Sequence, residues 1–272
     1  AGLVQVAHGH AVQVAGQHIG SERIIITTGA RPALPGIPGI ADVSPLDSTT
    51  ALALTELPRS MIVLGGGYIG VELAQTFARA GVEVTLVFRS RLLPEAEPEI
   101  GAALATYLAD EGIKIVSGIT YESARKTDDG GVALAIARDG RPEILTAERI
   151  LVATGRRSNT EALGLAETGI DLTPAGAIIV DDRMRTSKAG VYAAGDVTGK
   201  DQFVYMAAYG AKLAAKNALN GNSLSYDNTA MPAVVFTDPQ VASVGMTEAQ
   251  ARAAGHSART SVLSLDNVPR AL

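Results

Sequence analysis

Residues 60–90, SMIVLGGGYIGVELAQTFARAGVEVTLVFRS, constrain the fold more than any other stretch of this chain. A short apolar run, MIVL, leads into a glycine-rich turn. Ile69, Leu73 and Phe77 then recur at helical spacing, and Gly81 marks the end of the helix. A second apolar run, EVTLVF, follows directly. This order predicts a strand–turn–helix–strand unit of an α/β fold.

The glycines of the turn have the spacing Gly65-x-Gly67-x-x-Gly70. In this pattern the first glycine permits the tight turn, and the second lets the backbone approach a pyrophosphate. The third lets helix and strand pack closely. The unpaired N–H groups of the helix start face the phosphates, and so does the positive end of its dipole. We therefore predict a dinucleotide site formed by Gly65, Gly67, Tyr68, Ile69 and Gly70.

The end of the second strand distinguishes between dinucleotides. An Asp or Glu there would bond the ribose 2′-hydroxyl of NAD. Phe88 stands near this position instead, and Arg89 and Arg91 follow it. Guanidinium groups suit a 2′-phosphate, because they form bidentate charge-assisted bonds. The sequence therefore predicts NADPH, and the alternative is that both arginines are ordinary exposed charges.

An apolar strand that stops at Thr-Gly occurs twice, in IIITTGARP (24–32) and in ILVATGRRSN (150–159). Two related nucleotide-binding units, one nested in the other, would produce this repeat, and so would chance similarity between two buried strands. The remaining patterns predict helices over 98–112 and 202–221, strands around an Asp-Gly turn at 139–140 and strands through 177–199. A last helix is predicted to begin near Thr247.

Composition excludes several classes of protein. The net charge of the 272 residues is −5 and the basic residues are dispersed, so no nucleic-acid partner is expected. No apolar run approaches the ~18 residues that a membrane span needs. The chain has no cysteine, which excludes disulfides and thiol catalysis within it and fits a cytoplasmic location. No metal site is predicted, because His8, His10, His18 and His256 lack ligand spacing on a helix. His8 and His10 share one face of an expected strand, which favours a solvated face, and the alternative is a zinc pair.

In their order and spacing, TTGARP, GGGYIGVELA, ATGRRSN and AAGDVTG resemble the flavoprotein pyridine nucleotide–disulfide oxidoreductases. The resemblance implies a Rossmann-like FAD/NAD(P)-binding fold, in which an NADPH domain is inserted into an FAD domain, followed by the start of an α+β dimerisation domain. The implied boundaries are 1–34 and 155–229 for the two FAD segments, 35–154 for the NADPH domain and 230–272 for the truncated dimerisation domain. FAD and NADPH are the implied cofactors, and a homodimer is the implied assembly.

The resemblance also assigns roles to single residues. Tyr68 matches a tyrosine that lies over the flavin until nicotinamide displaces it, and Glu72 matches a glutamate that pairs with a flavin-side lysine outside this chain. Without the resemblance, Tyr68 is a packing residue and Glu72 a surface charge. Gly155 and Arg156 would line the NADPH cleft, and Asp196 would bond the ribityl chain of FAD. The residues implied to contact FAD are Ala11, Thr28, Gly29, Gly195, Asp196, Phe203, Val204, Tyr205 and Met206.

Within the family, QFVYMAAYGAKLAA, AMPAVVFTDPQVASVG and LSLDNVPRAL resemble the mercury(II)-reducing members. This implies that hydride passes from NADPH to FAD, and then to a cysteine pair that reduces Hg(II) to Hg(0). The family's first FAD glycine motif, its cysteine pair and its C-terminal region find no match here. The resemblance therefore implies an internal fragment that contains no catalytic residue and is inactive alone. The alternatives are a member that resembles lipoamide dehydrogenase or glutathione reductase, and a non-catalytic NADPH-binding module.

Overall fold

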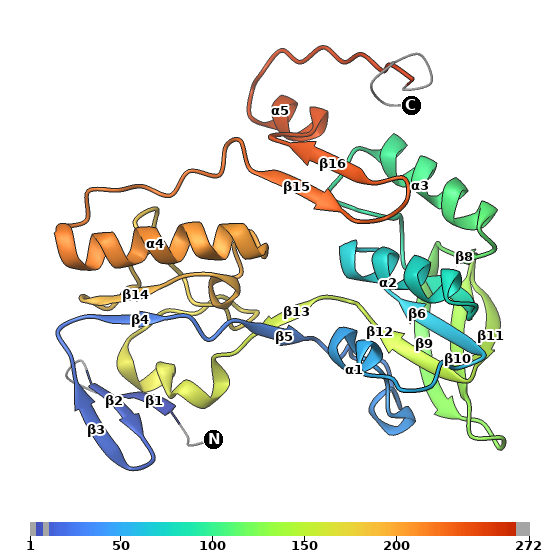
Figure 1. Cartoon of the computed structure of the whole chain (residues 1–272), viewed down its shortest axis with the longest axis horizontal. Coiled ribbons are helices and arrows are strands. Elements are labelled where there is room, and N and C mark those ends of the chain that lie inside the picture. The colour runs from blue at the N-terminus through green and yellow to red at the C-terminus, as the bar shows by residue number, and fades with distance from the viewer. Residues whose placement is uncertain (1–3, 8–10, 265–272) are drawn as a thin grey trace.

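The computed structural model describes residues 4–7 and 11–264. Figure 1 shows two lobes, joined by extended segments and bridged by a C-terminal hairpin. We call them the α4 lobe, which holds β1–β4, β14 and α4, and the α2 lobe, which holds α1–α3 and β6–β12. Among the described residues, no helix is both long and apolar enough to cross a membrane.

The α2 lobe is built on a four-stranded parallel sheet with the order β12-β6-β7-β8. Its strands are β6 (Ser60–Leu64), β7 (Glu83–Val87), β8 (Lys114–Val116) and β12 (Arg149–Val152). Its helices are α1 (Ser48–Leu52), α2 (Tyr68–Arg79) and α3 (Pro98–Asp110). The predicted strand–turn–helix–strand unit is confirmed, because α2 joins the parallel neighbours β6 and β7.

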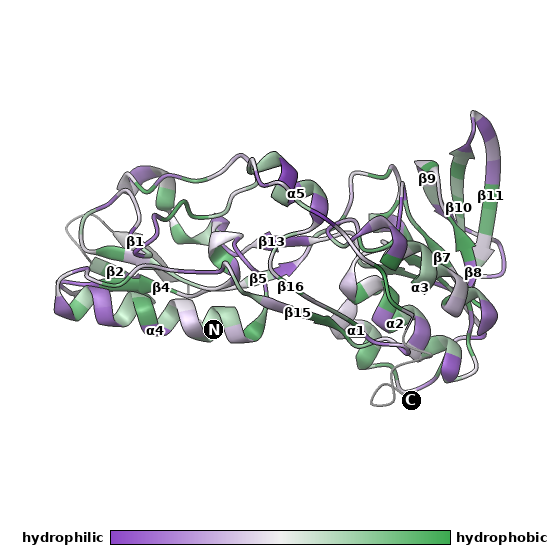
Figure 2. Ribbon diagram, turned by 90° about the horizontal axis from the view of Figure 1, so that it is seen from above, coloured by the Kyte–Doolittle hydropathy of each residue, from purple (hydrophilic) through white to green (hydrophobic). Residues whose placement is uncertain are grey.

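A three-stranded antiparallel sheet covers the other face of the parallel sheet (Figure 1). Its strands are β9 (Ile119–Lys126), β10 (Val132–Arg138) and β11 (Arg141–Ala147). Successive side chains of β6 point to opposite faces of the parallel sheet. Met61 and Val63 pack with α2 on one face, whereas Ile62 and Leu64 pack with β10 on the other. Asp139 and Gly140, with φ of 51° and 74°, form the predicted turn between β10 and β11. Figure 2 shows that the tip of this hairpin is hydrophilic.

The α4 lobe has a core of its own, in which Ile24, Ile26 and Val191 pack with Leu213 and Ala214 of α4. Its strands are β1 (Val4–Ala7), β2 (Ala11–Val14), β3 (Gln17–Gly20), β4 (Ile24–Ile26) and β14 (Val191–Ala193). β4 and β14 pair in parallel, and β1–β3 form an antiparallel sheet. The predicted helix over 202–221 is observed as α4 (Val204–Asn220), which ends at Gly221 with a φ of 87°.

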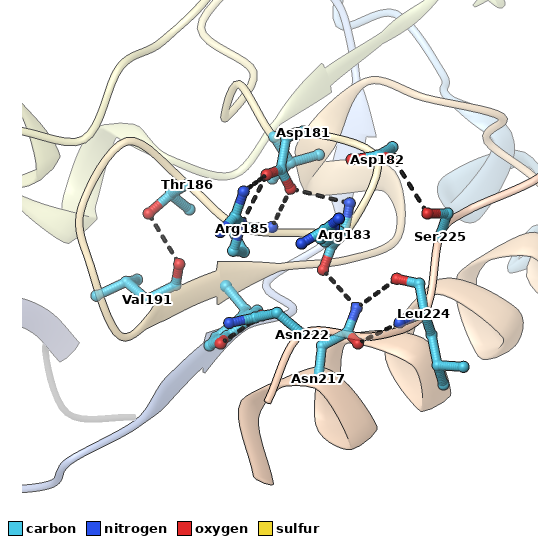
Figure 3. A network of polar contacts seen from close by, with 12 residues as sticks. Asp181, Asp182, Arg183, Arg185, Thr186, Val191, Asn217, Asn222, Leu224 and Ser225 are labelled. Carbon is cyan, nitrogen blue, oxygen red and sulfur yellow. Dashed lines mark hydrogen bonds and ion pairs between the residues drawn. The ribbon is translucent and has the colours of Figure 1, made fainter. Parts of the chain in front are cut away.

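The prediction of strands through 177–199 is largely wrong. Apart from β14, this segment contains isolated bridges and loops that side chains hold in place. Asp181 accepts from the backbone N–H groups of Arg183 and Arg185, and the Asn217 amide donates to the carbonyls of Arg183 and Leu224 (Figure 3). These bonds satisfy the backbone without a ladder, so the apolar residues of the segment can be buried in a loop.

Two short strand pairs connect the lobes. β5 (Ala30–Pro32) and β13 (Arg156–Ser158) form an antiparallel ribbon where the chain passes between them (Figure 1). β15 (Pro232–Val235) and β16 (Val241–Val244) form a hairpin beside α2, and Val235 enters the α2 core. The predicted last helix is α5 (Glu248–Ala253), capped by the Thr247 hydroxyl.

Candidate functional site

Packing alone requires two of the three glycines in the turn after β6. Gly65 has a φ of 120°, and a Cβ added there would lie 2.3 Å from the carbonyl oxygen of Ala153. A Cβ added to Gly70 would lie 2.0 Å from the carbonyl oxygen of Gly65. Both distances are too short for real atoms, so the strand and helix can meet this closely only without side chains.

The middle glycine of the motif, Gly67, faces open space. Gly67 is the N-cap of α2, and no described atom outside its chain neighbours lies within 4 Å of a Cβ built there. No side chain caps the helix at this point, so the first N–H groups of α2 are available to a ligand. The turn is therefore an open cradle, bounded by backbone donors, of the kind that a pyrophosphate fits.

At the carboxyl end of β7 the two predicted arginines, Arg89 and Arg91, have different contacts. Phe88 is buried in the α2 core, so the side chain near the position that would select NAD is apolar and is not a carboxylate. Arg89 is exposed and makes no hydrogen bond or ion pair with any residue that the structure describes. Arg91 donates from Nη2 to the carbonyl of Pro94, while its buried Nη1 has no partner there. Arg89 can therefore reach an anion in solution, whereas Arg91 is partly engaged and retains one unsatisfied donor.

Three aromatic rings run from the start of α2 to the start of α4. The ring of Tyr68 lies 5.6 Å from that of Phe203, which stacks on Tyr205 at 5.4 Å. The Tyr205 hydroxyl donates to the carbonyl of Pro232. Burial raises the pKa of Tyr68, and the nearby Glu95 raises it further, so its phenol stays protonated at neutral pH. The structure thus brings together three predicted residues from segments far apart in the sequence.

The Glu72 carboxylate has a partner that the sequence did not predict. Its Oε1 accepts from the backbone N–H of Phe236 at 2.8 Å, in the loop after β15. The sequence carries no local sign of this contact, because the two residues are 164 positions apart. Glu72 is therefore tied to the C-terminal hairpin as well as available to a partner on its exposed side.

Arg156 and Asp196 lie together where the β5–β13 ribbon meets the α4 lobe. The Arg156 Nε is 3.3 Å from Asp196 Oδ2, and its Nη2 donates to the carbonyl of Ala30 at 2.7 Å. The Ser158 hydroxyl donates to the Asp196 carbonyl. Gly155, with a φ of 131°, begins this stretch. The predicted NADPH-side and FAD-side residues thus meet at one ion pair.

The other predicted FAD residues fall into two groups. Near the ribbon, the Thr28 hydroxyl donates to the carbonyl of Asn159, whose amide returns a bond to the Thr28 carbonyl. Gly29 and Gly195 have φ of 69° and 76°, and at the start of α4 Val204 is exposed whereas Met206 is buried. Ala11 belongs to a different element, β2, where it pairs with Gly20.

The family was decided by comparison with known proteins. The family model described as "Pyridine nucleotide-disulphide oxidoreductase" matches residues 2–215, and the model of that family's dimerisation domain matches residues 231–272. The chain belongs to the pyridine nucleotide-disulphide oxidoreductase family. Membership confirms the predicted fold class and the predicted cofactor pair, FAD and NADPH. Which single residues touch which cofactor stays a prediction.

Several curated relatives in this family are mercuric reductases. The chain is 44% identical to that of Bacillus cereus, over 96% of this chain and 41% of the relative. It is 43% identical to that of Staphylococcus aureus, over 96% of this chain and 48% of the relative, and 45% identical to that of Streptomyces lividans, over 91% and 52%. The chain thus spans about half the length of these relatives.

The solved structure of a flavoprotein disulfide reductase superposes on nearly the whole chain. It is the HOCl-induced flavoprotein disulfide reductase RclA from Escherichia coli, with a TM-score of 0.86 and 34% sequence identity. The match covers 99% of this chain and 62% of the RclA chain. Both lobes and the C-terminal hairpin therefore have the arrangement found in a flavoprotein disulfide reductase.

Proposed function

We propose that this chain forms the NADPH-binding and flavin-facing part of an FAD-dependent oxidoreductase that reduces Hg(II) to Hg(0). The observation that carries the proposal is the open cradle at Gly67, which accepts a phosphate at the start of α2. The mercuric reductases among the relatives support Hg(II) as the final acceptor. The domain boundaries implied by the family, 1–34, 35–154, 155–229 and 230–272, are part of this proposal.

The residues of the α2 lobe bind and orient the reduced nucleotide. The N–H groups of the cradle would donate hydrogen bonds to the pyrophosphate of the nucleotide, and Arg89 would pair with its 2′-phosphate through a charge-assisted bond. Arg91 would add only its charge to this corner, because its Nη2 donates to the Pro94 carbonyl and its Nη1 is buried. Tyr68, whose ring packs on Phe203, would cover the flavin until the nicotinamide displaces it.

The residues of the α4 lobe hold the flavin. Asp196, which pairs with Arg156, would accept hydrogen bonds from the ribityl hydroxyls. The start of α4, from Phe203 to Met206, together with Gly29 and Gly195, would hold the flavin ring system. FAD, when bound, supplies the acceptor for the hydride of NADPH.

The chain has no cysteine, so the thiolates that deliver electrons to Hg(II) come from outside it. We propose a homodimer for the complete enzyme, supported by the match of residues 231–272 to the dimerisation domain. Hg(II) is the substrate of that enzyme and not a resident metal. A cytoplasmic location stays a prediction from the sequence.

A nucleotide titration of the purified 272-residue chain tests the proposal. NADPH should bind at least roughly tenfold more tightly than NADH, because only NADPH carries the 2′-phosphate. Arg89→Ala should remove that preference and leave the Kd for NADH unchanged. The matched control is Arg59→Ala, which removes another exposed arginine whose partner, Glu148, lies outside the site. Equal affinity for the two nucleotides in the wild-type chain would count against NADPH as the hydride donor.

The same preparation tests the role of the absent thiols. We expect no NADPH-dependent release of Hg(0), since the chain holds no thiolate. Release of mercury vapour by the chain alone would overturn this part of the proposal. An absorbance spectrum measured after addition of FAD separates the flavoprotein from a non-catalytic NADPH-binding module, which would bind the nucleotide but no flavin.

A further inference from the structure

Tyr121 in β9 lies on the core-facing side of the antiparallel sheet because its strand contains a β-bulge. Glu122 has no partner in β10, since the residues on either side of it pair with the consecutive residues Ala135 and Ile136. In a regular strand, Glu122 would share the buried face of Ala124, and Tyr121 would point to the opposite face. The extra residue reverses this alternation, so Tyr121 packs against the apolar core between the two sheets.

The Tyr121 hydroxyl reaches the carboxyl end of β7. It donates to the carbonyl oxygen of Val87 at 3.1 Å. The same carbonyl accepts from the backbone N–H of Gly65, the first glycine of the turn after β6, at 2.9 Å. The next residue, Phe88, donates its own N–H to the Val116 carbonyl of β8 at 3.0 Å. One carbonyl oxygen thus joins the glycine turn, the last residue of β7 and Tyr121.

Arg89 follows two residues after this carbonyl. Two residues of extended chain span about 7 Å, which is within reach of an arginine side chain. Burial raises the pKa of the Tyr121 phenol to about 12, and the positive charge of Arg89 opposes that rise. The phenol therefore stays protonated at neutral pH and donates its hydrogen to Val87. The lone pairs of its oxygen are left for a donor such as the Arg89 guanidinium.

An acceptor beside Arg89 matters because this side chain is long. An arginine loses rotamer freedom when it binds a phosphate, so a group that orders the guanidinium beforehand strengthens binding. Arg89 is exposed and has no partner among the residues that the structure describes. The phenol oxygen of Tyr121 is therefore in a position to supply that order.

We propose that Tyr121 is a positioning residue for NADPH, whose hydroxyl fixes the end of β7 and orients the Arg89 guanidinium toward the 2′-phosphate of the nucleotide. The inference rests on the proposed function and adds to it a residue that sets the preference for NADPH over NADH. Tyr121 acts through Val87 and Arg89 and takes no part in hydride transfer.

NADPH and NADH separate this role from a structural one, because they differ only in the 2′-phosphate. In the 272-residue chain, Tyr121→Phe removes the hydroxyl and keeps the ring in the core. It should raise the Kd for NADPH roughly fivefold, which corresponds to one ordinary hydrogen bond. The Kd for NADH should stay within about twofold, since the Gly65 N–H still holds the Val87 carbonyl. Titrations followed by nicotinamide fluorescence measure both values.

A double-mutant cycle shows whether Tyr121 acts through Arg89. In the Arg89→Ala background the guanidinium is absent, so Tyr121→Phe should raise the Kd for NADPH no more than about twofold there. Tyr209→Phe is the matched control, because it removes a hydroxyl that donates to another backbone carbonyl, that of Ser225, at 3.4 Å. It should change neither Kd. Tyr121→Leu, a second apolar replacement, gives the same test if the phenylalanine variant does not fold.

The outcomes are distinct. A loss of affinity for NADPH alone, absent in the Arg89→Ala background, supports the inference. An unchanged Kd for NADPH overturns it, and so does an equal loss for both nucleotides, because Tyr121 would then have only a structural role. A loss that persists without Arg89 also overturns it. If the wild-type chain does not prefer NADPH to NADH, the proposed function fails instead, and the wild-type titration tells the two failures apart.

Discussion

At the scale of single residues, the three glycines of the turn after β6 differ in what requires them. Gly65 and Gly70 are required by the protein itself, because any side chain there would overlap a backbone carbonyl. Gly67 is not required by the protein, since its φ of −83° is ordinary and the space around it is open. In this motif, Gly65 and Gly70 are therefore glycines because of packing, whereas the absence of a side chain at Gly67 is accounted for only by a ligand.

This difference predicts opposite effects of the same substitution. Gly67→Ala should change the free energy of unfolding by no more than about 1 kcal/mol, because the added methyl meets no atom of the protein. It should weaken NADPH binding more than roughly tenfold, because the methyl occupies the space of the pyrophosphate. Gly70→Ala should cost about 3 kcal/mol or more, because backbone must move to admit the methyl. Urea denaturation and NADPH titration measure the two effects. A destabilised Gly67→Ala variant that still binds NADPH would reverse the assignment.

The arginines show where residue-level prediction from sequence stops. The sequence predicts Arg89 and Arg91 as a pair, because their chemistry and spacing suit one phosphate. In the structure, Arg91 bonds the Pro94 carbonyl at the other end of its own loop. The path of a long side chain depends on the fold of that loop, and no local pattern encodes it. Residue type therefore predicted two cationic side chains at the end of β7, but not that Arg89 would be unpaired among the described residues while Arg91 bonds its own loop.

At the scale of elements, segments with their own start and stop signals were predicted well. α2 ends before Gly81, α4 ends at Gly221 and α5 begins after Thr247, each as the sequence indicates. The segment 177–190 was mistaken for strands because its apolar residues are buried, as those of strands are. Its backbone groups instead form hydrogen bonds with the side chains of Asp181 and Asn217, and Asn217 lies more than 25 residues further along the chain. Burial was readable from the sequence, but these partners were not.

The β5–β13 ribbon is the element whose stability should depend on acidity. Glu161 pairs with Arg31 at 2.7 Å and with Arg157 at 2.8 Å, one arginine from each strand. The hydrogen bond from Arg31 lowers the pKa of Glu161 from 4.5 to about 2. Because the folded pKa lies below the unfolded one, the stabilisation is complete above pH 4.5 and is lost as the pH falls toward 2.

Glu161→Gln should therefore lower the melting temperature at neutral pH, and the difference from wild type should shrink as the pH falls from about 5 toward 2. The effect should be small and should decrease with salt, because the pair is exposed to solvent. Thermal unfolding followed by circular dichroism across this range measures it. Glu167→Gln, a change of another exposed glutamate nearby, should show no such trend. A melting difference that does not vary with pH would show that the ion pairs do not stabilise the ribbon.

At the scale of the whole molecule, the described part of the chain has separate cores in its two lobes. The core of the α4 lobe and those of the α2 lobe share no residue. The two copies of the strand that stops at Thr-Gly lie in different lobes, as β4 and β12. The attachment of the hairpin to α2 was not predictable, since Gln75, which accepts from the Asp238 N–H, lies 163 positions away from it. A buried glutamine on an amphipathic helix was its one signal in the sequence.

Separate cores predict that each cofactor protects its own lobe. Hydrogen exchange followed by mass spectrometry should show that NADPH slows exchange in β6, α2 and β7, because a ligand stabilises the unit that binds it. Protection should extend to residues 236–238, whose backbone N–H groups donate to Glu72 and Gln75 of α2. It should not reach β4 and β14, whose core is separate, and FAD should slow exchange there instead. NADPH protection of β4 and β14 in the absence of FAD would show that the lobes unfold as one unit. Protection of β6–α2–β7 without residues 236–238 would show that the hairpin moves independently of the nucleotide site.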